Sequence, residues 1–212
     1  MARRSRVDYL LCMREILRRT IHILLLVAAG MVMSACGNVP LKAVEHVEIP
    51  RYMGDWYVLG HIPTSGEADA WNGVESYRLR PGSKDVVEVT FTFRHGAFDG
   101  PLETMHSTAH VNDDEPGRWG LHFYWWQGPF RFEYIIVDLD RDYQEVVIGR
   151  SARDYVWIMA RTPTLPEATW SRLLEVVQKA GYEPAKLRRV PQRWDAEPDL
   201  SPNDRHTATA AH

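Results

Sequence analysis

The chain has 212 residues, a length that predicts one domain or two small ones, and it is 45% hydrophobic and 25% charged, as ordinary globular domains are. Eight Trp, nine Tyr and six Phe predict either a large core or a lined cavity. The formal net charge is −3, and without the basic residues 1–35 it becomes −7, which argues against nucleic acid and against strongly anionic lipid surfaces as partners.

Residues 1–35 have the order of an export signal: a basic part, an apolar part and then small residues. The apolar run "IHILLLVAAGMVMSA" is about 15 residues long, too short to span a bilayer comfortably. The basic part before it is long for a signal. A start at Met13 would give the usual length, so we expect translation to begin there.

Cys36 follows "MSA" directly at the end of the apolar run. This arrangement resembles the lipobox of bacterial lipoproteins, in which that Cys is lipidated and becomes the mature N-terminus. The alternative is ordinary cleavage after Ala35, which would leave a free thiol. Gly37, where inner-membrane lipoproteins carry Asp, implies an outer-membrane location facing the periplasm. Cys12 would be removed with the signal, so the mature chain would contain no disulfide.

The mature part begins with an expected tether, residues 36–45, and continues with short segments of alternating hydrophobicity separated by turn residues. No helical pattern interrupts this series, which favours antiparallel pairing over βαβ units. The predicted strands are 56–62, 73–80, 86–93, 102–111, 118–126, 130–140, 145–151 and 155–162.

One helix is predicted after the strands, over residues 164–181. Thr164 and Glu167 have the spacing of a capping box, and Gly181 suits the position after the last turn. The apolar positions form a single stripe, so we expect the helix on the outside of the sheet. Residues 195–212 lack apolar periodicity and are predicted to be disordered.

These elements predict an all-β fold, an eight-stranded antiparallel up-and-down barrel with one C-terminal helix packed on its outside. Closure of the sheet leaves no exposed strand edges. A barrel of eight strands can hold a small ligand if the inward side chains do not fill it.

Three motifs resemble the signatures of the lipocalin family, in the family's order. "GDWY", with Gly54 and Trp56, is similar to the Gly-x-Trp signature of the first strand. "VDLDRDYQ", with Asp140 and Tyr143, resembles the loop between the sixth and seventh strands. "MARTPTLPE", with Arg161, resembles the end of the last strand. The match covers about residues 46–194. The lipobox, "GPF" and "RDYVWIMARTPTL" are similar to the outer-membrane lipocalins of bacteria, and "WYVLGHIPT" to apolipoprotein D.

The resemblance implies a structural role for Trp56, which in lipocalins covers the closed end of the barrel while the Arg of the third signature, here Arg161, packs over its ring. An indole covers a large apolar area, and a guanidinium stacks on its face while donating to nearby carbonyls. The loop "TSGEADAWNG" differs from that of close relatives, which leaves the ligand preference open.

The function implied by the resemblance is binding and storage or transport of lipids, fatty acids or lysophospholipids, for envelope maintenance, with a homodimer as an option. The alternatives are a structural envelope lipoprotein with a filled barrel and a lipocalin-fold enzyme that acts on an apolar substrate. Strand alternation places the expected ligand-binding side chains inward, with "HFYWW" aromatic on both faces. They are Val58, Gly60, Ile62, Val89, Phe91, Phe93, Phe123, Trp125, Tyr134 and Ile136.

No pattern predicts a catalytic group, a metal or a cofactor. His106 and His110 lie in a predicted strand, where at about 3.3 Å per residue their imidazoles would be about 13 Å apart, too far to share one ion. Neither a Gly-x-Ser-x-Gly motif nor a P-loop occurs, and no thiol nucleophile would remain after lipidation of Cys36. We therefore expect a binding protein and not an enzyme.

Overall fold

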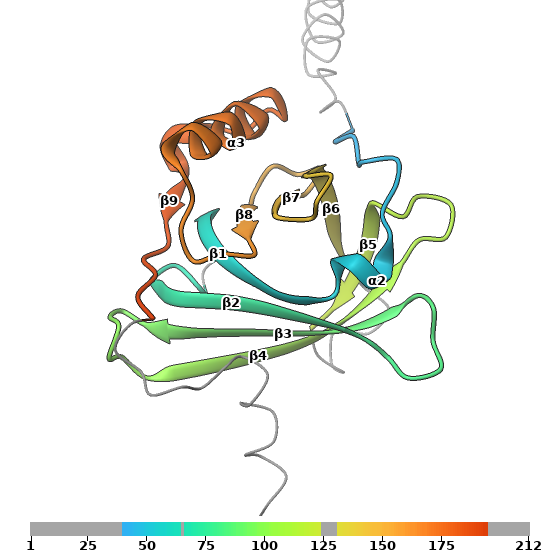
Figure 1. Cartoon of the computed structure of the whole chain (residues 1–212), viewed down its shortest axis with the longest axis horizontal. Helices are drawn as coiled ribbons and strands as arrows, with labels where there is room; N and C mark the ends of the chain where they lie inside the picture. Colours follow the sequence, from blue (N-terminus) through green and yellow to red (C-terminus); the bar gives the residue numbers. More distant parts are fainter. Residues whose placement is uncertain (1–39, 65, 124–130, 195–212) are drawn as a thin grey trace, which may run out of the picture. The chain divides into compact units, whose positions relative to one another are not determined.

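The computed structural model describes residues 40–64, 66–123 and 131–194, which form a closed antiparallel barrel with a helix on its outside (Figure 1). The expectations for Cys36, for the start at Met13, for Trp125 and for residues 195–212 lie outside this part of the chain. The elements are α2 (Ile49–Tyr52), β1 (Gly54–Ile62), β2 (Ala70–Leu79), β3 (Val86–His95), β4 (Leu102–Val111), β5 (Arg118–His122), β6 (Phe132–Leu139), β7 (Glu145–Gly149), β8 (Val156–Ala160), α3 (Glu167–Lys179), η2 (Pro184–Lys186) and β9 (Arg188–Arg189).

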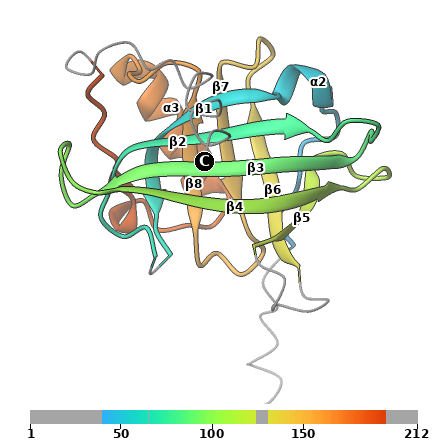
Figure 2. The ribbon, with the colours of Figure 1, turned by 90° about the horizontal axis from the view of Figure 1, so that it is seen from below.

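The strands pair in chain order from β2 to β8, and β1 pairs with both β8 and β2, which closes the barrel. This confirms the eight-stranded antiparallel barrel expected from the alternating segments. Figure 2 shows β2, β3 and β4, each of ten residues, side by side across one wall. The short strand β9, which the sequence did not predict, adds to the second half of β1 through Gly60 and His61.

A β-bulge in β1 changes which of its side chains face inward. The β1–β8 register shifts between Val58 and Gly60, so that Leu59 is the extra residue. A bulge inserts one residue and thereby reverses the alternation that follows it. Val58 therefore belongs to the interior cluster, whereas Ile62, beyond the bulge, packs in the cluster under α3.

Two apolar clusters lie on opposite sides of the barrel wall. The interior cluster is rich in aromatic side chains and includes Trp56, Trp119 and Tyr134. The outer cluster joins β7 and β8 to Trp170, Leu173 and Val177 of α3, all buried, so the helix covers the outside of the barrel as its single apolar stripe predicts.

Helix α3 begins later than its sequence suggested. Its N-cap is Pro166 and no side chain caps it, so the capping box of Thr164 with Glu167 was a wrong prediction. Thr164 instead accepts a hydrogen bond at its carbonyl from the Thr162 hydroxyl (2.8 Å). Gly181, with φ of +88°, ends the helix as expected.

The Trp56 ring is fully buried, and the Arg161 guanidinium lies 3.8 Å from the ring centroid. Arg161 also donates to five carbonyl oxygens, at 2.8–3.3 Å, which tie α2 and the start of β1 to the β6–β7 loop; they belong to Arg51, Tyr52, Met53, Asp55 and Tyr143. Gly54 has φ of +96°, and a Cβ there would lie 3.4 Å from Nη1 of Arg161. The geometry therefore explains why Gly, Trp and Arg occur together.

The β6–β7 loop is held by the other two signature residues. The Asp140 carboxylate accepts hydrogen bonds from the backbone N–H groups of Asp142 (2.9 Å) and Gln144 (3.3 Å), which caps the turn. The Tyr143 hydroxyl accepts a hydrogen bond from the backbone N–H of Glu48 (2.7 Å), and its ring lies under the guanidinium of Arg51. The loop is thus fastened to α2.

Part of the expected tether belongs to the folded domain. Leu41 and Ala43 are buried in the outer cluster, and the backbone N–H of Val44 donates to the carbonyl of Ile136 (2.9 Å). Residues 41–44 of the expected tether are therefore part of the folded domain. Among the residues described, no helix is long and apolar enough to cross a membrane.

Candidate ligand-binding site

A cavity of about 460 Å³ occupies part of the barrel interior. Five of its thirteen described lining residues are aromatic: Phe91, Phe123, Phe132, Tyr155 and Trp157. The remaining lining residues are Thr64, Gly66, Glu67, Glu75, Met105, Ser107, Arg150 and Asp154. The volume lies within the range of about 300–1,000 Å³ that small-molecule sites occupy.

Of the residues expected to bind ligand, Phe91 and Phe123 line this cavity. Five others are part of the interior cluster but do not line it, and they fill the rest of the barrel: Val58, Val89, Phe93, Tyr134 and Ile136. Alternation correctly placed these side chains inside the barrel, but it could not distinguish the filled part from the hollow part. Packing in three dimensions decides that.

Two of the expected ligand-binding residues face outward, because of the bulge at Leu59. A Cβ at Gly60 would lie 2.5 Å from the Trp170 ring of α3, so this glycine allows the helix to approach the barrel. Ile62 packs in the same outer cluster. The prediction that Gly60 and Ile62 contact a ligand was therefore wrong.

His61 faces inward in their place, opposite Trp157. It is 1% exposed, and its Nδ1 atom has no hydrogen-bond partner in the described part of the chain. Burial, with a smaller contribution from the charge of Arg188, lowers the pKa of His61 to about 4, so the imidazole is neutral at pH 7.

Beside the cavity, in the filled part of the barrel, a chain of tyrosine hydroxyl groups ends on the carboxyl group of Glu75. The Tyr77 hydroxyl donates to Oε2 of Glu75 (2.6 Å), and Tyr77 is linked through Tyr134 (2.6 Å) to Tyr52 (2.7 Å). Because each hydroxyl has one proton, Tyr134 then donates to Tyr77 and Tyr52 donates to Tyr134. Three hydrogen-bond donors in series therefore point towards Glu75.

Glu75 is the most unusual group in the cavity wall, since it is a carboxyl group only 3% exposed with no ion-pair partner among the residues described. Burial raises its pKa to about 8, in spite of the hydrogen bond from Tyr77, and the charge of Glu67 contributes in the same direction. Glu67, also 3% exposed, accepts a hydrogen bond from the backbone N–H of Thr64 (3.0 Å), and burial raises its pKa as well.

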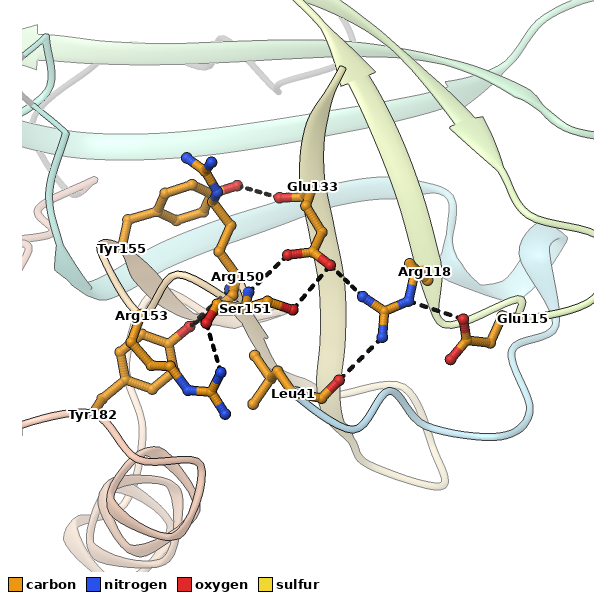
Figure 3. Close-up of polar contacts among 9 residues, drawn as sticks. All are labelled: Leu41, Glu115, Arg118, Glu133, Arg150, Ser151, Arg153, Tyr155 and Tyr182. Atoms are coloured by element: carbon orange, nitrogen blue, oxygen red, sulfur yellow. Dashed lines mark hydrogen bonds and ion pairs between the residues drawn. The ribbon is translucent and has the colours of Figure 1, made fainter. Parts of the chain in front are cut away.

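Arg150 also lines the cavity, and its backbone is held from outside the barrel (Figure 3). The Tyr182 hydroxyl accepts from the backbone N–H of Arg150 (2.7 Å) and donates to its carbonyl (3.0 Å). The Glu133 carboxylate accepts from the backbone N–H of Ser151 (2.7 Å) and from Arg118. The guanidinium of Arg150 forms an ion pair with Asp154 (3.1 Å), so this positive charge is already compensated.

The sequence reasoning missed Glu75, Glu67 and Trp157, and only the first left a usable signal. Glu75 and Tyr77 are two residues apart in β2, so their side chains lie on the same face of the strand. Since Tyr77 points into the barrel, the carboxyl group of Glu75 does so as well. Glu67 lies in a loop, where alternation does not apply. Trp157 lies in β8, where all five residues are buried and parity carries no information.

A comparison with known protein families matches residues 47–192 to a lipocalin-like domain. The protein belongs to the lipocalin family. It is 28% identical to temperature-induced lipocalin-1 of Arabidopsis thaliana, over 72% of this chain and 83% of that protein. It is 26% identical to the outer membrane lipoprotein Blc of Escherichia coli K12 (78% and 92%) and 23% identical to apolipoprotein D of Bos taurus (72% and 79%). This lipocalin thus has bacterial, plant and animal relatives.

Solved structures agree on the fold of this lipocalin. The cockroach allergen Per a 4 superposes with a TM-score of 0.55 at 19% identity, over 74% of this chain and 96% of the allergen. Insecticyanin of Manduca sexta superposes with a TM-score of 0.56 at 13% identity, over 78% and 87%. The lipocalin fold implies binding of a small hydrophobic ligand, and none of the relatives reported above carries the name of an enzyme.

Proposed function

We propose that this lipocalin binds lipids, fatty acids or lysophospholipids, in its barrel cavity and stores or transports them for envelope maintenance. The observation that supports this most directly is the cavity of about 460 Å³ with its aromatic wall, in a barrel whose remaining interior is filled. At about 30 Å³ for each non-hydrogen atom, the cavity holds about 15 such atoms, enough for a fatty acid of about 12 carbons or for the acyl chain of a lysophospholipid. Burial of each CH₂ contributes about 0.8 kcal/mol, so a chain of this length would be retained.

The proposed location is the outer membrane, with the barrel facing the periplasm and an acyl anchor on Cys36. The motif "MSAC" and the similarity to outer membrane lipoproteins support it. Mass spectrometry of the protein purified from membranes tests the anchor, and an unmodified Cys36 thiol would refute it. Assembly into a homodimer stays a prediction, which light scattering of the purified protein tests.

Titration with a fluorescent fatty acid, together with mass spectrometry of lipid extracted from the purified protein, tests the binding function. The variant Met105→Trp places a larger side chain in the cavity, and we expect it to weaken binding by at least about tenfold, or about 1.4 kcal/mol. His106→Trp is the matched control, because His106 is the next residue of β4, is exposed and bonds to Thr90 on the outer face.

The alternatives make different predictions in the same experiment. Absence of both uptake and co-purified lipid would favour a structural envelope lipoprotein. Turnover of a bound lipid would favour an enzyme that acts on an apolar substrate. Equal binding by Met105→Trp and the wild type would show that the ligand binds elsewhere.

A further inference from the structure

The cavity combines an apolar wall with an excess of acidic groups. Besides Tyr155, its lining contains four ionisable groups. They are the carboxyl groups of Glu67, Glu75 and Asp154 and the guanidinium group of Arg150. Since Arg150 is paired with Asp154, no cation in the described part of the chain compensates Glu67 or Glu75. A ligand that carries a negative charge would therefore meet two uncompensated carboxyl groups and one guanidinium, which Asp154 already pairs through Nη1 and whose buried Nε donor has no partner among the residues described.

We propose that the cavity selects amphiphiles that carry an amine, whose ammonium group binds at Glu75. This inference rests on the proposed lipid-binding function and narrows its ligands to amphiphiles with an amine head group, in preference to fatty acids. Glu75 lines the cavity, and its Oε2 accepts the hydrogen bond from Tyr77, while its Oε1 makes no hydrogen bond to another of the residues described. An ammonium group has three donors and no acceptor, so it complements a carboxylate with one oxygen still available.

The surroundings of Glu75 favour an amine over other head groups. Its neighbours in register on β1 and β3 are Trp56 and Phe91, neither of which titrates. A ligand carboxylate would be repelled by the charge of Glu67 and could bind only with an additional proton. A hydroxyl group would form one hydrogen bond but no charge pair, and hydrogen bonds between charged groups are the stronger ones.

The groups that face Glu75 determine how binding depends on pH. Three buried tyrosines face it from α2, β2 and β6, and burial raises their pKa values well above the usual one, so they stay neutral. The other titratable groups around it are Glu67 of the β1–β2 loop and, near β8, Arg150, Asp154 and Tyr155. Because burial raises the pKa of Glu75 to about 8, its carboxyl group must lose its proton before an ammonium group pairs with it. Affinity for an amine should therefore rise with pH from about 6 to 8, by up to about tenfold per unit.

Three ligands of equal chain length test the proposal: dodecylamine, dodecanol and dodecanoic acid, each below the concentration at which it aggregates. Binding is measured by calorimetry and by the change in intrinsic Trp fluorescence between pH 6 and pH 9, where the amine stays charged. At pH 8 we expect dodecylamine to bind at least about ten times more tightly than dodecanoate. Dodecanol binding should not depend on pH, and dodecanoate binding should weaken as the pH rises.

The variant Glu75→Gln keeps the shape of the side chain but cannot ionise. We expect it to lose the preference for the amine while its affinity for dodecanol stays within about threefold of wild type. Glu88→Gln is the control, because Glu88 lies on the outer face of β3 and is exposed. If Glu75→Gln does not fold, the pH profile of the wild type decides, and an amine affinity that is constant from pH 6 to 8 would refute the proposal.

The outcomes separate this inference from the function on which it rests. Binding of dodecanol and dodecanoate without preference for the amine would refute the inference and leave lipid binding intact. An amine preference that persists in Glu75→Gln would also refute it, since another group would then be responsible. Failure of all three ligands to bind would refute the proposed function itself, and the inference with it.

Discussion

Replacement of Trp56 by Ala tests whether this residue closes the barrel. The indole is fully buried, donates through Nε1 to the carbonyl of Tyr52 (2.9 Å), and lies under the guanidinium of Arg161. A side chain of this size buries about 200 Å², which at about 25 cal/mol per Å² corresponds to about 5 kcal/mol. Ala retains a part of that area, whereas the lost hydrogen bond adds about 1 kcal/mol. We expect the free energy of unfolding to fall by about 3–5 kcal/mol.

Urea unfolding followed by circular dichroism measures this loss by linear extrapolation. Trp71→Ala is the matched control, because Trp71 is partly exposed and touches Phe98 edge-on, and it should lose about 1 kcal/mol. If Trp56→Ala is too unstable to purify, Trp56→Phe should lose about 1–2 kcal/mol. A loss below about 1 kcal/mol for Trp56→Ala, or one equal to that of Trp71→Ala, would refute the closing role. Since Trp56 does not line the cavity, dodecanol affinity of the folded variant should stay unchanged.

Three further predictions follow from the same contacts. Gly60→Ala should lower the free energy of unfolding by about 1–3 kcal/mol without changing ligand affinity, because the new methyl group would collide with the indole of α3; altered affinity at unchanged stability would contradict the outward placement. Asp140→Ala removes the cap of the β6–β7 turn and should lower the free energy of unfolding, measured with urea, by about 1 kcal/mol. The control variant Asp142→Ala should lower it by less than about 0.5 kcal/mol. The pKa of Glu75 rises from 4.5 to about 8 on folding, so the folded state binds its proton more tightly and stability falls as the pH rises through that interval. Folding lowers the pKa of His61 from 6.5 to about 4, which makes stability increase with pH below about 6.5 and offsets the effect of Glu75 there. The loss of stability should therefore appear between about pH 6.5 and 8, at up to about 1.4 kcal/mol per pH unit. Urea unfolding of Glu75→Gln at pH 6.5 and at pH 8 should show no such loss of stability. An equal loss in this variant would refute the assignment of the effect to Glu75.

The bulge in β1 illustrates why the sequence misplaced Gly60 and Ile62. In "GDWYVLGHI" four apolar residues, Trp56 to Leu59, follow one another, and a bulge leaves no mark in such a run. Its cause is tertiary, because beyond Val58 the strand pairs with β8 on one side and β9 on the other, while α3 approaches at Gly60. The alternation of inward and outward side chains was reliable only up to the point where β9 replaces β2 as the second partner of β1.

The signature residues were predictable for the opposite reason. Gly54, Trp56 and Arg161 make contacts that depend on their own chemistry: a positive φ, a large flat ring and a planar group with five donors. Few other residue types could replace them, so the motif itself carries the structural information. The cavity wall has no such requirement, because many apolar side chains serve equally well, and so the sequence did not show which of them line it.

The sequence by itself determined the barrel, its outer helix and its family. Strand alternation, a single apolar stripe and three ordered motifs are local patterns, and each can be recognised within its own segment of the chain. The tertiary structure decided where the barrel is hollow and that Glu75, rather than a neutral side chain, lies in the cavity wall. The physical reason is that a cavity and a raised pKa arise from groups brought together from many strands, and no single segment of the chain contains that information.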